Sequence, residues 1–210
     1  MLGANDGIVS TASLIIGVAS AGSAQGAVLV AGLAGLVAGA MSMAAGEYVS
    51  VSSQTDAETA DLDKEAAELK AAPDAELDEL AGLYVARGLD RELARQVAVQ
   101  LSAGGALEAH ARDELGIQET TTARPVQAAL VSALSFASGA SVPLVVAYLS
   151  TSRVTVLVSL TSLAALALLG ALGAYAGGAP IVKGALRVSV WGALAMGATA
   201  AVGAIFGVSA

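Results

Sequence analysis

The sequence predicts an all-α integral membrane protein with five transmembrane helices and one acidic helical insert. Three observations lead to this prediction: charged residues are scarce, they gather in one segment, and the rest of the chain forms long charge-free runs. Only 13% of the 210 residues are charged and 56% are hydrophobic, whereas soluble domains carry roughly 25% charged residues. Of the 10 basic and 18 acidic residues, seven basic and 16 acidic ones lie between Asp56 and Arg124. This distribution excludes a disordered chain, a disulfide-stabilised secreted module and an ordinary soluble domain.

The number of spans follows from the charge-free runs. They cover residues 7–46, 125–152, 154–182 and 188–210. A helix crosses a bilayer with about 20 apolar residues, so the first run holds two helices, with a turn at the small polar stretch 21–26, and each other run holds one. The runs also lack the two-residue alternation of transmembrane β-strands. We therefore predict two spans in 1–52, an acidic helical domain in 53–124 and three spans in 125–210.

The insert is predicted to be a set of short helices. The residues that break or cap these helices are Pro73, Asp74, Gly88, Asp90, Gly104, Gly105 and Gly116. Asp74 is predicted to cap a helix over 75–87, and Asp90 to cap the next one. The segment 56–70 contains neither proline nor glycine and is predicted to continue the second span. A last helical piece is expected over 106–115.

Loop charges predict the orientation of the chain, because Lys and Arg gather on the cytoplasmic side of membrane proteins. The insert carries seven of them, a loop predicted at about 176–187 adds Lys183 and Arg187, and the opposite side carries only Arg153. This pattern places the insert and the N-terminus in the cytoplasm and the C-terminus outside. The spans are rich in glycine and alanine, which let helices pack closely. Because five such helices make a thin bundle, we predict a homodimer.

Paired side chains in the insert suggest a metal site. The pairs are Glu65 with Glu68, Glu76 with Glu79, and His110 with Glu114, spaced three or four residues apart. On a helix each pair projects from one face, and the short turn between the first two pairs lets them face each other. Carboxylate donors with one imidazole suit Fe2+, Mn2+ or Zn2+ better than copper. A solvated acidic face without an ion is the alternative interpretation.

Polar residues near the spans predict an ion pathway, because ionisable groups at membrane depth are usually functional. Counted from the turn at Gln25, Asp6 lies 19 residues back, Met43 lies 18 forward and Glu47 lies 22 forward. With a rise of about 1.5 Å per residue, Asp6 and Met43 reach nearly the same depth. Glu47 then lies about one turn further towards the cytoplasm. A carboxylate and a thioether at one depth can hold a cation such as Fe2+, whereas the alternative is that Asp6 caps the first helix.

Several motifs together resemble the vacuolar iron transporter family. They are NDGIVST at 5–11, MAAGEYVS at 43–50, the four paired glutamates of the insert, and ELG at 114–116. The resemblance covers essentially the whole chain. It implies a dimeric Fe2+/H+ antiporter whose pore lies between the subunits and is lined by the first helices. It further implies that Asp6 and Met43 bind the ion in transit, with Glu47 near the cytoplasmic mouth.

The same resemblance implies metal binding by the insert. The residues that match the family's ligands are Glu65, Glu68, Glu76, Glu79 and Glu114. Family members carry methionine one turn before the last of these glutamates, whereas this sequence has His110. Imidazole is less selective than a thioether for Fe2+ over Mn2+ or Zn2+. The sequence therefore leaves the choice among these ions open.

These features predict a secondary transporter, not an enzyme, that moves Fe2+ or Mn2+ out of the cytoplasm in exchange for protons. No prosthetic group is expected, and the expected partners are the lipid bilayer, a second copy, divalent metal ions and protons, with no nucleic acid. A bacterial-type chain without an organellar targeting segment favours the plasma membrane. The alternatives are a metal-gated passive channel, a membrane-tethered metal buffer or sensor, and a ferroxidase. The last is the least favoured, because the repeated Glu-x-x-His motifs of di-iron bundles are missing.

Overall fold

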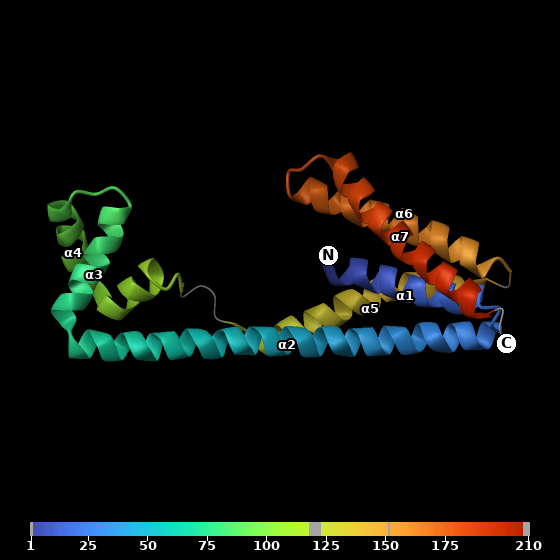
Figure 1. Cartoon of the computed structure of the whole chain (residues 1–210), viewed down its shortest axis with the longest axis horizontal. Helices are drawn as coiled ribbons and strands as arrows, with labels where there is room; N and C mark the ends of the chain where they lie inside the picture. Colours follow the sequence, from blue (N-terminus) through green and yellow to red (C-terminus); the bar gives the residue numbers. More distant parts are fainter. Residues whose placement is uncertain (1, 118–122, 151, 208–210) are drawn as a thin grey trace. The chain divides into compact units, whose positions relative to one another are not determined.

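The computed structural model describes residues 2–117, 123–150 and 152–207, which contain seven α-helices and no β-strand (Figure 1). The helices are α1 (Leu2–Ser20), α2 (Gln25–Ala71), α3 (Pro73–Ala86), α4 (Arg91–Asp113), α5 (Pro125–Leu149), α6 (Val154–Ala176) and α7 (Ile181–Gly207). Five of them, α1, α2, α5, α6 and α7, are long and apolar enough to cross a membrane. The predicted all-α fold with five candidate spans is confirmed for the described residues. Residues 118–122 of the predicted insert and 208–210 of the predicted last span lie outside the described residues.

The chain divides into two compact units. The membrane unit contains Met1–Tyr48 and Val126–Ala210, and the insert unit contains Val49–Pro125. Helix α2 belongs to both units and runs for 47 residues. It continues without a break because the sequence between Gly46 and Pro73 contains no proline or glycine. The prediction that 56–70 continues the second span is confirmed.

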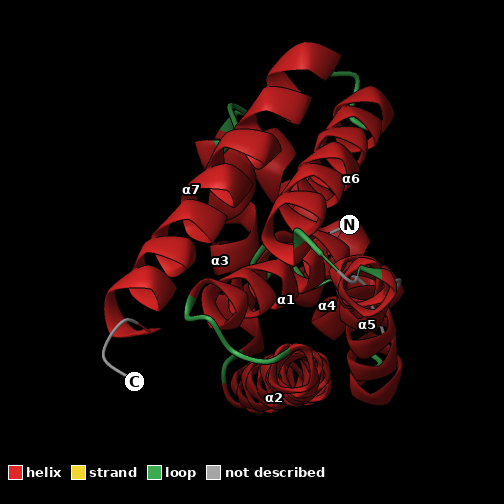
Figure 2. Ribbon diagram, turned by 90° about the vertical axis from the view of Figure 1, so that its right-hand side faces the viewer, coloured by secondary structure: helices red, strands yellow, loops and turns green. Residues whose placement is uncertain are grey.

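Helix α1 is the central helix of the membrane unit. It packs against α6 and α7, and glycines bring it close to α5 and α2. Gly7 of α1 faces the Phe136 carbonyl of α5, and Gly139 of α5 faces the Ala4 carbonyl of α1. Gly32 of α2 lies against the Ile15 side chain of α1. Figure 2 shows α1 surrounded by these neighbours, which is the close packing that the small residues predicted.

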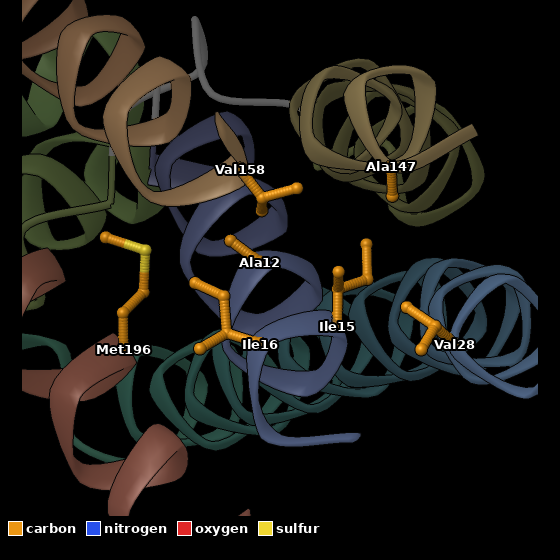
Figure 3. Close-up of a cluster of buried hydrophobic side chains, with 7 residues drawn as sticks. All are labelled: Ala12, Ile15, Ile16, Val28, Ala147, Val158 and Met196. Atoms are coloured by element: carbon orange, nitrogen blue, oxygen red, sulfur yellow. The ribbon is translucent and has the colours of Figure 1, made fainter. Parts of the chain in front are cut away.

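All five spanning helices contribute to one apolar core around α1 (Figure 3). Its buried members are Ala12, Ile15, Ile16, Val28, Ala147, Val158 and Met196. Ile15 and Ile16 are consecutive, so their side chains leave α1 in different directions and bridge to different neighbours. In lipid, where apolar contact with solvent costs little, van der Waals packing of this kind holds helices together.

Replacing Gly139 with alanine is expected to destabilise the α1–α5 crossing. A Cβ at position 139 would lie 2.8 Å from the Ala4 carbonyl carbon, which is helix backbone and cannot rotate away. Overpacking costs roughly 1–3 kcal/mol, so the thermal unfolding midpoint in detergent should fall by several degrees. Gly197→Ala is the matched control, because a Cβ at position 197 meets nothing within 4 Å. Equal midpoints for the two variants would contradict this packing.

In the insert unit, α3 and α4 pack against each other. Their shared core consists of Leu80, Ala81, Ala98 and Ala109. As predicted, Asp90 caps α4, and its side chain accepts a hydrogen bond of 3.0 Å from the Leu93 backbone N–H. The predicted interruption is also present, because Gly105 has φ 151° and kinks α4. Only glycine adopts this conformation without strain.

The start of α3 differs from the prediction. The helix begins at Pro73, with Ala72 at the N-cap position and no side-chain capping hydrogen bond, so Asp74 does not cap it. Proline suits the first helical position, because its φ is already helical and its missing N–H would have no partner there. Asp74 instead lies in the first turn of the helix, where a negative charge is favourable.

The last span also begins earlier than predicted. The segment 176–187 was expected to be a loop, but α7 begins at Ile181, so Lys183 and Arg187 lie in its first two turns. The sequence between Pro180 and Arg187 contains no helix-breaking proline. The long side chains of lysine and arginine can extend from a helix end towards water, so their charges do not exclude them from a spanning helix.

Candidate metal sites

Three helices of the insert unit bring metal-binding side chains together. Glu65 comes from α2, Glu76 from α3 and His110 from α4. Each offers one donor atom, and these atoms all lie within 4.8 Å of one another. The three residues are buried, with exposed fractions of 4%, 9% and 0%. The prediction that the first two glutamate pairs lie near each other therefore holds for one member of each pair.

His110 is the centre of this group. Its Nδ1 lies 2.9 Å from Glu65 Oε1 and 2.9 Å from Glu114 Oε2. Because Nδ1 carries at most one proton and is hydrogen-bonded to Glu114, Glu65 Oε1 lies close to it without receiving a hydrogen bond. His110 Nε2 and Glu65 Oε1 are both buried without a hydrogen-bond partner. Buried polar atoms without partners are costly, and a cation bound at Glu65 Oε1 would satisfy that oxygen.

The electrostatics of the group also favour a cation. Burial raises the pKa of Glu65, and the charges of Glu114, Glu76 and Glu68 raise it further, against the opposing effect of His110. Such crowding of carboxylates is unfavourable unless a positive charge is added. Oxygen donors with one imidazole fit a divalent metal such as Fe2+, Mn2+ or Zn2+.

The two remaining predicted glutamates lie outside the closest group. Glu68 is half-buried and forms an ion pair of 3.5 Å with Lys64. Glu79 is exposed on α3. Glu68 is still near enough to affect the pKa of Glu65. The side chains that the helices bring together are thus Glu65, Glu76, His110 and Glu114.

A second candidate site lies between helices of the membrane unit. Asp6 of α1 and Met43 of α2 line one hollow of about 360 Å³. Ser10, Ser42 and Phe136 also line it. Asp6 lies inside α1, which begins at Leu2, so the alternative that it caps the helix is wrong. The arrangement follows the equal depth that residue counting predicts for Asp6 and Met43.

Glu47 lies one helical turn after Met43 on α2. It is exposed and does not line the hollow. Met41, two residues before Met43, is 67% exposed and is also absent from the lining. Of the two methionines in this part of α2, Met43 therefore lines the hollow and Met41 does not.

The chain matches the model of the VIT family over residues 1–204. The chain belongs to the VIT family. It is 49% identical over 205 residues to a protein named vacuolar iron transporter from Acanthamoeba castellanii, which covers 97% of this chain and 76% of that relative. It is also 36% identical over 210 residues to vacuolar iron transporter homolog 1 from rice, Oryza sativa subsp. japonica, covering 99% and 72%. The resemblance identified in the sequence is confirmed.

Sequence reasoning missed a network that fixes the end of α4 in this VIT chain. Asp113 accepts hydrogen bonds from the Tyr84 hydroxyl at 2.7 Å, from Arg87 at 3.0 Å and from Arg112 at 2.8 Å. Arg87 also lies over the Tyr84 ring, 5.4 Å from its centre. Because Asp113 directly precedes Glu114, the network holds the turn that carries His110 and Glu114. No sequence pattern links Tyr84 to a residue 29 positions away.

Replacing Tyr84 with phenylalanine is expected to destabilise the insert unit. The Tyr84 hydrogen bond is the main reason why the pKa of Asp113 falls from 3.8 to about 2. A carboxyl whose pKa is lower in the folded state stabilises the fold at pH values above its ordinary pKa. This stabilisation is lost as the pH falls from about 4 towards 2. Hydrogen bonds to charged groups contribute roughly 1.5–3 kcal/mol. The variant should therefore unfold at lower temperature at pH 7, and its difference from wild type should shrink between pH 4 and 2.

The matched control for this measurement is Arg95→Gln, which breaks the ion pair between Arg95 and Asp78. Both side chains of that pair are exposed, at 54% and 64%, and exposed pairs contribute little. Thermal unfolding followed by circular dichroism compares the two variants. If both lower the midpoint equally, the Tyr84–Asp113 contact has no special role.

Proposed function

We propose that this VIT chain is a proton-coupled antiporter that moves Fe2+ out of the cytoplasm, and that it also accepts Mn2+. The observation that carries the proposal is the hollow lined by Asp6 and Met43 on two membrane-spanning helices. A carboxylate and a thioether offer one hard and one soft donor, which suits Fe2+. The relatives named as vacuolar iron transporters support iron as the cargo.

The insert captures the ion in this proposal. Glu65, Glu76, His110 and Glu114 supply the donors, and Glu68 and Glu79 add negative charge around them. The insert unit has many more acidic than basic residues, which raises the local concentration of cations. The seven Lys and Arg of the insert support a cytoplasmic location for it under the positive-inside rule. The ion then passes Glu47 and reaches Asp6 and Met43.

A second copy completes the pathway in this proposal. Asp6 is exposed in the single chain, and the spanning part of α2 has the smallest buried share among the five candidate spans of the described residues. A homodimer that joins two such faces would enclose the Asp6 hollows between subunits. We place the dimer in the plasma membrane, with the C-terminus outside.

Proton coupling follows from the chemistry of the ligands. An ionised Asp6 carboxylate attracts the cation, and protonation from the far side removes that charge. The ion then leaves, and deprotonation on the cytoplasmic side restores the site. Each transported ion is therefore exchanged for protons, and the proton gradient drives the cycle. This step needs only the carboxylate of Asp6 and the change of access that alternating transporters perform.

Flux through sealed proteoliposomes tests the proposal. Fe2+ uptake is measured with and without an imposed proton gradient, beside Mn2+ and Zn2+ and beside protein-free liposomes. We expect Fe2+ and Mn2+ flux that follows the gradient, with proton movement in the opposite direction. Flux that ignores the gradient would indicate a passive channel. Absence of flux while the chain still binds metal would indicate a buffer or sensor.

A further inference from the structure

A separate cavity lies where α6 and α7 cross near their connecting turn. The helices approach closely there, because a Cβ on Gly170 would lie 2.7 Å from the Gly184 carbonyl oxygen. Beside this crossing is a cavity of about 480 Å³, and Asn5 of α1 lines it as well. Its lining includes two cations from the first turns of α7, Lys183 and Arg187. The cavity is distinct from the Asp6 hollow, with which it shares no lining residue.

The same two cations also border a hollow on the outer face of α7. This hollow has a volume of about 610 Å³ and is otherwise lined by apolar residues. Leu186, Val190 and Trp191 line it and are exposed at 59%, 53% and 70%. The positively charged start of α7 thus lies next to an apolar strip along the same membrane-spanning helix.

Lys183 and Arg187 have no negative partner within the described residues, where neither forms a hydrogen bond or an ion pair. The acidic residues of the membrane unit are Asp6 and Glu47, and Asp6 lines the other hollow. Lys183 and Arg187 are both exposed near the start of a spanning helix, and basic residues at such positions attract ligands that bring negative charge.

We propose that Lys183 and Arg187 bind the phosphate of an anionic phospholipid whose acyl chain lies along Leu186, Val190 and Trp191. Basic pockets between spanning helices recognise lipid head groups in this way. The cation pair matches the phosphate, and the adjoining apolar strip matches the chain. Free phosphate would use only the first of these features, so the lipid is the better fit. The site does not depend on the proposed transport function.

The chain's single tryptophan allows a direct test, because Trp191 lines the outer hollow. The full-length protein is reconstituted with phosphatidylglycerol or phosphatidylcholine that carries bromine on its acyl chains, which quenches nearby tryptophan. We expect brominated phosphatidylglycerol to quench Trp191 at a several-fold lower mole fraction than brominated phosphatidylcholine. Lys183→Gln and Arg187→Gln should each reduce this preference about fivefold, the factor that one basic residue contributes at an anionic membrane surface.

Arg153→Gln is the matched control, because it removes one exposed positive charge at the start of α6, outside both hollows. It should leave the preference unchanged. Equal quenching by both lipids, an unchanged preference in the Lys183/Arg187 double variant, or an equal loss in Arg153→Gln would overturn the proposal. Protection from quenching by both lipids would show that another surface, such as a second copy, covers the hollow. Full competition by millimolar inorganic phosphate would assign the cations to a free anion instead.

Discussion

Replacing Asp6 with asparagine is expected to lower Fe2+ flux by about 100-fold or more, because the amide cannot supply the negative charge that offsets the cost of a cation inside the membrane. Asparagine has nearly the same size and shape as aspartate, so folding and dimer content should not change. Flux into proteoliposomes with an imposed proton gradient measures the effect. Size-exclusion chromatography checks the assembly.

The control for Asp6→Asn is Asp63→Asn, the same chemical change at an exposed position of α2 in the insert unit. It should leave flux within a factor of two of wild type. Transport at the wild-type rate by the Asp6 variant would show that the hollow shared with Met43 does not carry the ion. Equal loss in both variants would show that total negative charge matters rather than the position of Asp6.

Replacing Glu65 with glutamine is expected to weaken metal binding by the insert by about 100-fold. The change removes a buried ligand, and this should weaken binding more than the loss of a residue that only orients a ligand. In the absence of metal, the same change should leave the insert as stable as the wild type or make it more stable. The pKa of Glu65 is raised by burial and by its acidic neighbours, so its contribution to stability is present below the ordinary glutamate pKa and lost as the pH rises through the raised value. Glutamine imitates the protonated form and should not lower the metal-free unfolding midpoint at pH 7.

Weaker metal binding without a loss of metal-free stability distinguishes a lost ligand from a misfolded insert. Isothermal titration of the full chain with Mn2+ and Zn2+ gives the affinity, and the metal-induced rise in the unfolding midpoint reports binding independently. Glu108→Gln, at an exposed position on α4, is the control and should retain both. A Glu65 variant that binds metal normally would remove Glu65 from the site. A variant that loses stability without metal would indicate a structural role instead.

The sequence predicted the parts of the fold that depend on distance along the chain. The bilayer has a fixed thickness, so the lengths of the charge-free runs were sufficient to count five spans. The same reasoning placed Asp6 and Met43 at one depth, because the helical rise per residue is constant. Local chemistry also identified the cap at Asp90 and the kink at Gly105. It fails at the start of α7, where charged residues suggest a loop, although their long side chains can extend from a helix end towards water.

Only the tertiary structure decided which side chains meet. Spacing of three residues puts Glu76 and Glu79 on one broad face of α3, but it does not fix the rotation of that helix against α2 and α4. Packing of Leu80 and Ala81 against α4 sets this rotation, so that Glu76 is buried beside Glu65 and His110 while Glu79 stays exposed. The link from Tyr84 to Asp113 and the two hollows beside Lys183 and Arg187 likewise depend on how separate helices pack. The sequence alone therefore determined the spans and the candidate ligands, and helix packing selected the ligands that can share one ion.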